Sequence, residues 1–311
     1  MNPGVLATAL VVLLAARPAV AATIDVTSDA DEGAGTLRDA IERANDEPGS
    51  TIEIRGGSGV MIMLERELPA LRATGTVVDG GGATLREGER CERGGRKKGC
   101  DGLVIAGPRI TVRNLRITGF LLDGIAVRGP RTSGVRIEDI HSVDNLDDGI
   151  GISDGAGPVT IERSILMGNG FRTKGKGVLV FSDSRATIVR SVAIGNRDGV
   201  TASRRSHAIL EDVVVAGNYD KGIGASAASV EATDVFVLAN GRDPGEPAPN
   251  GDGVRAGLDG DVDLRGSLIA GNGDAGVVVL DQSSARLVDC RIEGNRGRQV
   301  SVAPSAHLDK R

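Results

Sequence analysis

The chain has 311 residues, of which 37 are Lys or Arg and 42 are Asp or Glu, giving a net charge of −5. This balance, the absence of a basic block and an aromatic content of only 2% argue against nucleic-acid binding. With no Trp and one Tyr, the core must be built from Val, Ile, Leu and Ala, and the 46 glycines recur at turn positions of a repeat.

Residues 1–22 resemble a secretory signal peptide. Val5–Ala16 is an apolar run too short to span a bilayer, and Ala19-Val20-Ala21 offers a small-x-small cleavage site. The segment before Val5 lacks the usual Lys or Arg, and an N-terminal membrane tether is the alternative. We expect a secreted or periplasmic protein whose mature chain has no transmembrane segment.

Residues 23–50 are predicted to form an N-terminal cap. Residues 23–27 alternate as a strand does, and a short amphipathic helix is expected over Thr36–Asn45. Thr36 is suited to cap this helix. One helix face is apolar and consists of Leu37, Ala40, Ile41 and Ala44. Such a helix can cover the open end of a stack of strands.

Residues 51–109 contain short, irregularly spaced strand patterns and two of the three cysteines. Cys91 and Cys100 flank a polar loop, which in an exported protein predicts a local disulfide. Free thiols are the alternative, and a metal site would need more ligands nearby. Cys290 falls among small core residues, so we expect a buried thiol there.

From residue 110 to 303 a sequence motif of alternating apolar residues recurs. It ends in Gly-Asn or a similar turn and is followed by Gly-apolar-x-apolar. The shortest spacing, from Asn196 to Asn218, is 22 residues. Three short strands in each repeat cannot bury their faces alone, but stacked repeats can. The turn asparagines should form an amide ladder. They are Asn145, Asn169, Asn196, Asn218, Asn240, Asn272 and Asn295.

The repeats align into columns of like side chains. One column should point inward from every turn: Val112, Ile137, Ile161, Ile188, Leu210, Ala232, Leu264 and Leu287. A second follows the Gly of each turn: Ile125, Ile150, Val178, Val200, Ile223, Val254, Val277 and Val300. Stacking at the spacing of parallel strands, about 4.8 Å, would join these residues into one aliphatic core.

This pattern resembles the right-handed parallel β-helix proteins, which include pectate lyases and polygalacturonases. Residues 36–54 are also similar to the first segment of a group of secreted bacterial β-helix repeat proteins. The resemblance implies an all-β, right-handed parallel β-helix of about ten turns, closed by the N-terminal helix. We therefore expect one domain over residues 23–311, with a cap (23–50), irregular turns (51–109) and regular repeats (110–303).

The position before each repeat Gly is usually charged, and this column is the first candidate site. Asp123, Asp148 and Lys176 should lie on successive turns, with Asp147 beside them. Crowded carboxyls can provide an acid beside a base for glycoside cleavage. Alternatively, the three aspartates could hold Ca²⁺, with Lys176 as base in uronate elimination. Ordinary Asp-Gly turns carrying a solvated charge ladder explain the same residues.

The segment Asn145–Ile150 resembles the Asn-x-Asp-Asp segment of polygalacturonases, which implies acid and base roles for Asp147 and Asp148. That family also uses a Gly-His-Gly on the next turn and an Arg-Ile-Lys further on. Here the next turn reads Lys174-Gly175-Lys176-Gly177, and there is no Arg-Ile-Lys. Interruptions at 171–175 and 241–251 fall in the same turn and would wall a binding face.

A second candidate site is a basic cluster made of Arg185, Arg204, Arg205 and His207. Guanidinium groups can bind a carboxylated or sulfated glycan through paired hydrogen bonds. A solvated loop is the alternative. The sequence therefore predicts an exported protein that presents a surface to a polysaccharide or cell-surface glycan. The alternatives are a lyase or hydrolase of uronate-containing glycan, with Ca²⁺ as the possible cofactor, and a purely structural envelope module.

Overall fold

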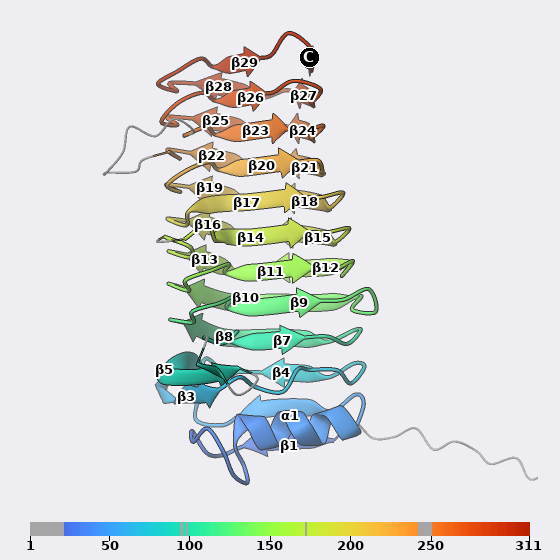
Figure 1. Cartoon of the computed structure of the whole chain (residues 1–311), viewed down its shortest axis with the longest axis vertical. Coiled ribbons are helices and arrows are strands. Elements are labelled where there is room, and N and C mark those ends of the chain that lie inside the picture. The colour runs from blue at the N-terminus through green and yellow to red at the C-terminus, as the bar shows by residue number, and fades with distance from the viewer. Residues whose placement is uncertain (1–21, 94–95, 98, 172, 242–250) are drawn as a thin grey trace, which may run out of the picture.

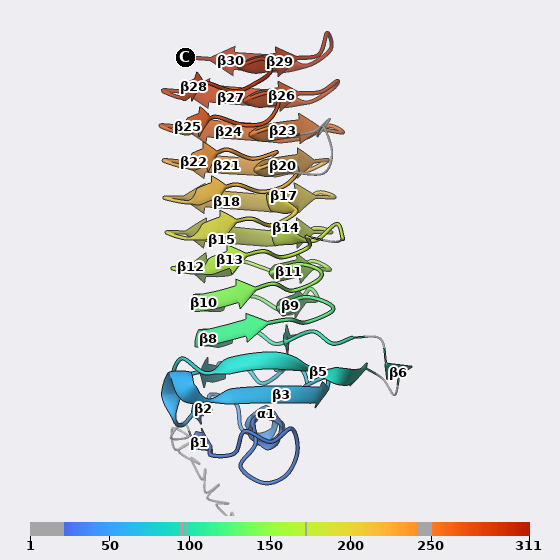
Figure 2. The ribbon, with the colours of Figure 1, turned by 90° about the vertical axis from the view of Figure 1, so that its left-hand side faces the viewer.

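The chain winds into turns that stack along one axis, and successive turns place strands side by side (Figures 1 and 2). The computed structural model describes residues 22–93, 96–97, 99–171, 173–241 and 251–311. Nearly all of the predicted signal peptide lies outside these residues. About 11 turns are formed, one more than the repeats predict.

The predicted N-terminal strand and helix are both present. After β1 (Thr23–Val26), α1 (Leu37–Asp46) begins at Thr36, whose hydroxyl accepts a hydrogen bond from the backbone N–H of Asp39 at 3.3 Å. The expected apolar face, made of Leu37, Ala40, Ile41 and Ala44, is buried. Figure 1 shows α1 lying across one end of the stack, where it shields the apolar core from water.

The irregular turns place the first strands of the stack and one inserted hairpin. These elements are β2 (Thr51–Ile54), a 3₁₀ turn (Gly57–Gly59), β3 (Met61–Arg66), β4 (Val77–Asp79), β5 (Thr84–Arg93), β6 (Arg96–Lys97) and β7 (Leu103–Ile105). The β5–β6 pair is antiparallel, whereas every other strand pair among the described residues is parallel.

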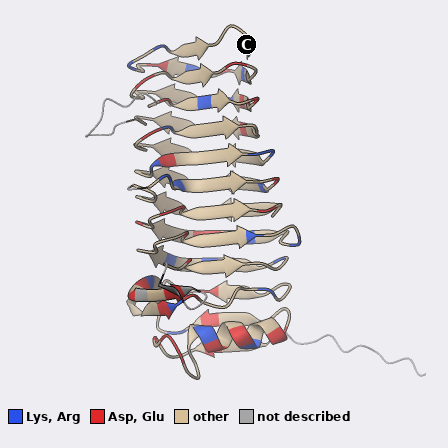
Figure 3. Ribbon diagram, viewed as in Figure 1, with Lys and Arg blue, Asp and Glu red and all other residues tan. Residues whose placement is uncertain are grey.

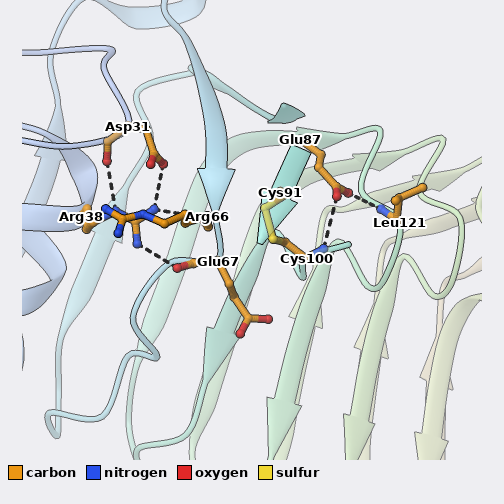
Figure 4. Close-up of a disulfide and its surroundings, with 8 residues drawn as sticks. All are labelled: Asp31, Arg38, Arg66, Glu67, Glu87, Cys91, Cys100 and Leu121. Atoms are coloured by element: carbon orange, nitrogen blue, oxygen red, sulfur yellow. Dashed lines mark hydrogen bonds and ion pairs between the residues drawn. A yellow bond between two sulfur atoms is a disulfide. The ribbon is translucent and has the colours of Figure 1, made fainter. Parts of the chain in front are cut away.

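The predicted Cys91–Cys100 disulfide is confirmed and closes this hairpin, with the two Cα atoms 5.9 Å apart (Figure 4). Glu87 holds the end of the loop. Its carboxylate accepts hydrogen bonds from the backbone N–H of Cys100, at 3.3 Å, and of Leu121 on the next turn. The disulfide therefore joins the two ends of the insertion, and Glu87 links it to the next turn.

Nine strands form one sheet, in which each neighbour comes from the next turn. After β7 they are β9 (Ile125–Arg128), β11 (Ile150–Ser153), β14 (Lys176–Phe181), β17 (Asp198–Ser203), β20 (Ile223–Ser226), β23 (Val254–Gly257), β26 (Val277–Val279) and β29 (Val300–Val302). This nine-stranded sheet faces the viewer in Figure 1.

The larger sheet, of 21 strands, forms the other sides of the stack. Its first regular strands, β8 (Thr111–Thr118) and β10 (Val135–Val143), are long. Each later turn has two shorter strands: β12 (Val159–Glu162) and β13 (Ile165–Met167), β15 (Arg185–Val189) and β16 (Val192–Ile194), β18 (His207–Glu211) and β19 (Val214–Ala216), β21 (Ser229–Thr233) and β22 (Phe236–Leu238), β24 (Asp261–Arg265) and β25 (Leu268–Ala270), β27 (Ser284–Val288) and β28 (Arg291–Glu293). The last strand is β30 (His307–Lys310).

The predicted core columns are confirmed residue by residue. Ile161 pairs with Ile188, and Ile188 pairs with Leu210, while Val178 pairs with Val200 in the nine-stranded sheet. All these side chains are buried. Cys290 is only partly buried and packs against the core, and its Sγ lies 3.3 Å from the carbonyl oxygen of Leu264.

The predicted asparagine ladder runs through the whole regular array. The Nδ2 of each Asn donates to the Oδ1 of the next at 2.7–3.1 Å, from Asn145 to Asn295. The backbone N–H of each Asn donates to the same Oδ1, so every buried amide is satisfied within the ladder. These bonds set the register of the turn that precedes the nine-stranded sheet.

Candidate functional site

The predicted charged column is a ladder of carboxylates at one edge of the nine-stranded sheet. The Oδ1 of Asp123 accepts a hydrogen bond from the backbone N–H of Asp148 at 3.1 Å, and the Oδ1 of Asp148 accepts one from Lys176 at 2.7 Å. Asp101 extends the ladder by one turn, since its Oδ1 accepts from the N–H of Asp123 at 3.1 Å. The sequence analysis missed Asp101, although it carries the same Asp-Gly signal.

Burial distinguishes this ladder from the solvated one that was the alternative. Asp101, Asp123 and Asp148 are 0%, 9% and 4% exposed, whereas Asp147 is exposed. Arg128 compensates part of the charge, with its NH2 nitrogen 2.9 Å from Asp101 Oδ2 and 3.6 Å from Asp123 Oδ2. The structure therefore brings three of the four predicted catalytic residues into an acid cluster, which we define as Asp123, Asp147 and Asp148.

The acid cluster holds a proton near neutral pH. Burial, together with the charges of Asp101 and Asp147, raises the pKa of Asp123 to about 7, against the opposing effect of Arg128. Burial first and the neighbouring Asp123 second raise the pKa of Asp148 well above its usual range. A carboxyl group that ionises near neutrality beside an exposed carboxylate has the properties of a general acid–base pair.

The acid cluster fits Ca²⁺ poorly. One carboxylate oxygen from each of its three residues lies within 4.8 Å of the other two. However, one carboxylate oxygen of Asp123 and one of Asp148 already accept a hydrogen bond from a backbone N–H. Arg128 lies beside the other oxygen of Asp123. Ca²⁺ takes about six to eight oxygen ligands.

A hollow of the described surface begins at the next turn. It is a groove of about 450 Å³ over β14, β17, β20 and β23, and we call it the cationic groove. Its lining contains five cations and two acids: Lys174, Lys176, Arg197, Lys221, Arg255, Asp198 and Asp220. Figure 3 shows that most of this sheet is uncharged, so the charges gather in a few strands and turns. Of the predicted catalytic residues, only Lys176 lines this groove.

The floor of the cationic groove contains polar atoms without a protein partner. Asp198 Oδ1 and Thr201 Oγ1 are buried and make no hydrogen bond, while Asp198 Oδ2 accepts from Lys221 Nζ at 2.8 Å. Gly224 keeps the floor open, because a Cβ there would lie 2.7 Å from Lys221 Cε and 3.4 Å from Thr201 Oγ1. Buried polar atoms are normally satisfied, so these two indicate a polar ligand.

Arg255 lines the groove, and an aromatic pair lies in the turns that carry two of its other residues. Arg255 Nε donates to Asp252 Oδ2 at 2.7 Å, which places its guanidinium along the groove. The rings of Phe171 and Tyr219 pack 4.6 Å apart at an interplanar angle of 49°. Tyr219 is the residue before the groove residue Asp220, and Phe171 lies in the turn that carries Lys174. The single Tyr of the chain is therefore next to a groove residue in the sequence, although neither ring lines the groove.

The predicted basic cluster lies beyond the carboxyl end of β17, whereas Asp198 lies at the amino end of that strand. Arg205 forms a bidentate pair with Asp183 at 2.7 Å, and Arg204 lies over the ring of Phe181 at 4.7 Å. His207 pairs in register with Arg185, and its Nδ1 is 2.7 Å from the hydroxyl oxygen of Ser229. These four residues are neighbours, but they do not line the cationic groove.

The two interruptions predicted to wall a binding face meet the groove only in part. Lys174 lies in the first interruption and lines the groove. Arg172 and residues 242–250 of the second lie outside the described residues. The sequence analysis missed Arg197, Thr201, Asp220 and Arg255, because only stacking brings these dispersed residues together.

The fold has known relatives among solved structures. An alginate lyase from Paenibacillus sp. str. FPU-7 has 16% identity over 93% of this chain and 98% of its own, with a TM-score of 0.61. The A-module of the Azotobacter vinelandii mannuronan C-5 epimerase AlgE4 has 16% identity over 92% and 97%, with a TM-score of 0.57. Pectate lyase Pel9A has 15% identity over 92% and 77%, with a TM-score of 0.53.

At these identities the structures show a shared fold and no more. No curated protein matches the sequence. The model of the right-handed β-helix region matches residues 48–193 and 176–309, which together span most of the chain. The parallel stack, its in-register core columns and this match lead to one conclusion: the chain belongs to the right-handed β-helix family.

Proposed function

We propose that this protein binds an acidic polysaccharide in the cationic groove. The observation that carries the proposal is the coincidence, in one groove, of five cationic side chains with two buried, unpartnered oxygens. Ammonium and guanidinium groups bind carboxylates strongly. Asp198 Oδ1 needs a donor, and a sugar hydroxyl supplies one while also accepting from Thr201.

The groove geometry favours a polymer over a small anion. The groove crosses strands of four successive turns, so a bound chain would run along the axis of the stack. We expect the aromatic pair, in turns that carry groove residues, to give a sugar ring an apolar surface. Alginate, mannuronan and pectate, the polymers in the names of the structural neighbours, are the uronate polymers to test first.

Export fits this proposal. A disulfide is stable in an oxidising compartment, and Cys91 and Cys100 form one. Among the described residues, no helix has the length and apolar character needed to cross a bilayer. We propose that residues 1–22 direct the protein to the periplasm or the exterior, where such polymers occur.

The test is titration calorimetry of the purified protein with alginate, polygalacturonate and dextran at low and high salt. We expect binding of the two acidic polymers, weakening as salt rises, and no binding of the neutral one. Equal binding of dextran, or no binding of either acidic polymer at low salt, would contradict the proposal. The second result would favour a purely structural envelope module.

The acid cluster supports a second candidate function, cleavage of a uronate polymer. Asp123 has a pKa of about 7 and lies beside exposed Asp147, which is on the turn before Lys176. Incubation with uronate polymers, with and without Ca²⁺, should then produce unsaturated ends or new reducing ends. Asp147→Asn should abolish this turnover. Equal turnover by Asp147→Asn and the wild type would remove the acid cluster from any enzymatic role.

A further inference from the structure

One wall of the stack is apolar on its outer side. The short strands β13, β16, β19, β22 and β25 pair in register. They lie one above another in Figure 1. Successive residues of a strand point to opposite sides, so two residues of each strand face outward. We call these ten residues the apolar face: Ile165, Met167, Val192, Ile194, Val214, Ala216, Phe236, Leu238, Leu268 and Ala270.

The apolar face is accessible to solvent in this structure. Met167, Ile194 and Phe236 are 41%, 38% and 48% exposed. Side chains of this size are uncommon on an open surface, and a contiguous group of them usually marks an interface. The composition of this wall therefore needs an explanation that the core does not provide.

The neighbouring wall of the same sheet shows what an open wall of this solenoid looks like. On β21 and β24 the corresponding outward positions are occupied by Glu231, Thr233, Asp263 and Arg265. The apolar face is also bounded at both ends, by His141 of β10 and by Arg291 and Glu293 of β28. The apolar character is thus confined to one patch.

Charge along one edge of the apolar face changes sign at its middle. The second residue before each of these strands has a left-handed backbone. It is Arg163, Arg190, Asp212 and Asp234 before β13, β16, β19 and β22, and Gly266 before β25. These positions carry arginines in the first half of the edge and aspartates in the second. Arg163 pairs with Glu138, Asp139 and Glu162 of its own chain, and Arg190 pairs with Glu162. Asp212 and Asp234 form no ion pair among the described residues.

We propose that the apolar face is the interface of an antiparallel, two-fold dimer of this chain. A two-fold axis that lies in the face, perpendicular to the stack and between β16 and β19, packs the two sheets against each other at about 10 Å. It places Arg190 beside the partner's Asp212, and Arg163 beside the partner's Asp234. The half of the edge that carries arginines in one copy thus faces the half that carries aspartates in the other.

The charges along this edge favour a second copy of the chain, and not a membrane surface, as the partner of the apolar face. Peripheral membrane faces combine apolar residues with a basic rim, because the lipid headgroups are anionic. Here half of the rim is acidic, and the sign change matches its own inverted copy. Five strands spaced by about 4.8 Å make a patch about 20 Å long, which corresponds to a small interface and a reversible dimer.

This dimer is independent of glycan binding, because the cationic groove lies on the nine-stranded sheet. The test is sedimentation velocity of the full mature chain from low to high micromolar concentration. Ile194→Asp should weaken the dimer at least about tenfold, since a carboxylate would be buried in an apolar interface. The matched control is Ile209→Asp, because Ile209 is an outward isoleucine of β18 on the polar wall.

The orientation has its own test. Arg190→Asp and Asp212→Arg should each weaken the dimer, and the double variant should restore it, because the swap rebuilds both contacts. Circular dichroism confirms that each variant is folded. A wild type that stays monomeric at every concentration overturns the proposal, as does a dimer insensitive to Ile194→Asp. A dimer indifferent to both charge reversals overturns the antiparallel arrangement.

Discussion

The Oδ1 of Asn196 accepts two hydrogen bonds from Asn169 on the preceding turn, both at 2.9 Å, one from its side-chain amide and one from its backbone N–H. Both residues are fully buried. One side chain thus satisfies two donors of another turn, and its own Nδ2 continues the ladder to Asn218 at 3.1 Å. Contacts between successive turns are therefore polar at this corner, whereas those within the core columns are apolar.

Asn196→Ala should strongly destabilise the fold. It leaves two buried donors of Asn169 without an acceptor, and each unsatisfied group costs about 1–3 kcal/mol. We expect a loss of about 3–5 kcal/mol in urea unfolding followed by circular dichroism. Gln299→Ala is the control, because exposed Gln299 ends the ladder by accepting from Asn295 and water can replace it. Equal losses for the two variants would mean that the ladder is not a buried support.

Stability should fall as the pH rises through the range set by Asp123. In the unfolded chain its carboxyl ionises near 3.8, whereas burial raises the pKa to about 7 in the folded protein. Between these values only the folded state retains the proton, so the contribution present below about pH 4 is lost as the pH rises to about 7. Asp123→Asn should therefore raise the melting temperature at about pH 8 and leave it nearly unchanged at about pH 4.

Asp139→Asn gives the opposite sign and serves as the matched control. Hydrogen bonds from Arg163 lower the pKa of Asp139, so its contribution is present above its ordinary pKa and is lost as the pH falls. This variant should lose stability at neutral pH, although only slightly, because the pair is exposed. Identical pH profiles for wild type and Asp123→Asn would show that Asp123 ionises normally.

Reversing one charge of the cationic groove should weaken binding of an acidic polymer. Lys174 lines the groove and its side chain is exposed, so Lys174→Glu leaves the core intact. We expect affinity for alginate or polygalacturonate to fall about tenfold or more at low salt, with a smaller loss at high salt. Lys310→Glu adds the same charge on exposed β30, outside the groove, and should change affinity little.

The aromatic pair should contribute through its ring surface. Tyr219→Phe keeps the packing against Phe171, whereas Tyr219→Ala removes it. Calorimetry should show near-normal affinity for the first variant and a loss of about 0.5–1.5 kcal/mol for the second. Equal affinities for the two variants would exclude the pair from the binding surface.

Removal of the disulfide should destabilise the hairpin turn. Cys91 and Cys100 are nine residues apart, and closing a loop of this length stabilises the folded state by about 2–3 kcal/mol in the chain-entropy account. Cys91→Ser should lower the midpoint of thermal unfolding, and added reductant should not lower it further. Because both cysteines are buried in the folded protein, reductant should reach the disulfide only after unfolding. The midpoint of the wild type in reductant should then approach that of the variant.

The sequence by itself determined the stack. The repeats from Asn145 to Asn295 place like residues one turn apart, and parallel pairing requires like residues to lie next to each other, so Ile161, Ile188 and Leu210 could be aligned without coordinates. The helix at Leu37 and the disulfide at Cys91 also follow from local patterns, because capping, amphipathicity and loop closure act over a few residues.

Only the tertiary structure decided which charges meet. Lys174, Thr201 and Arg255 belong to different turns, and the groove they share depends on how far each turn projects from the stack. Burial of Asp123 depends likewise on neighbouring turns, so its raised pKa has no local signature. A repeat specifies what lies above and below each residue, whereas a site also depends on side chains brought in from the turns, whose positions are not periodic.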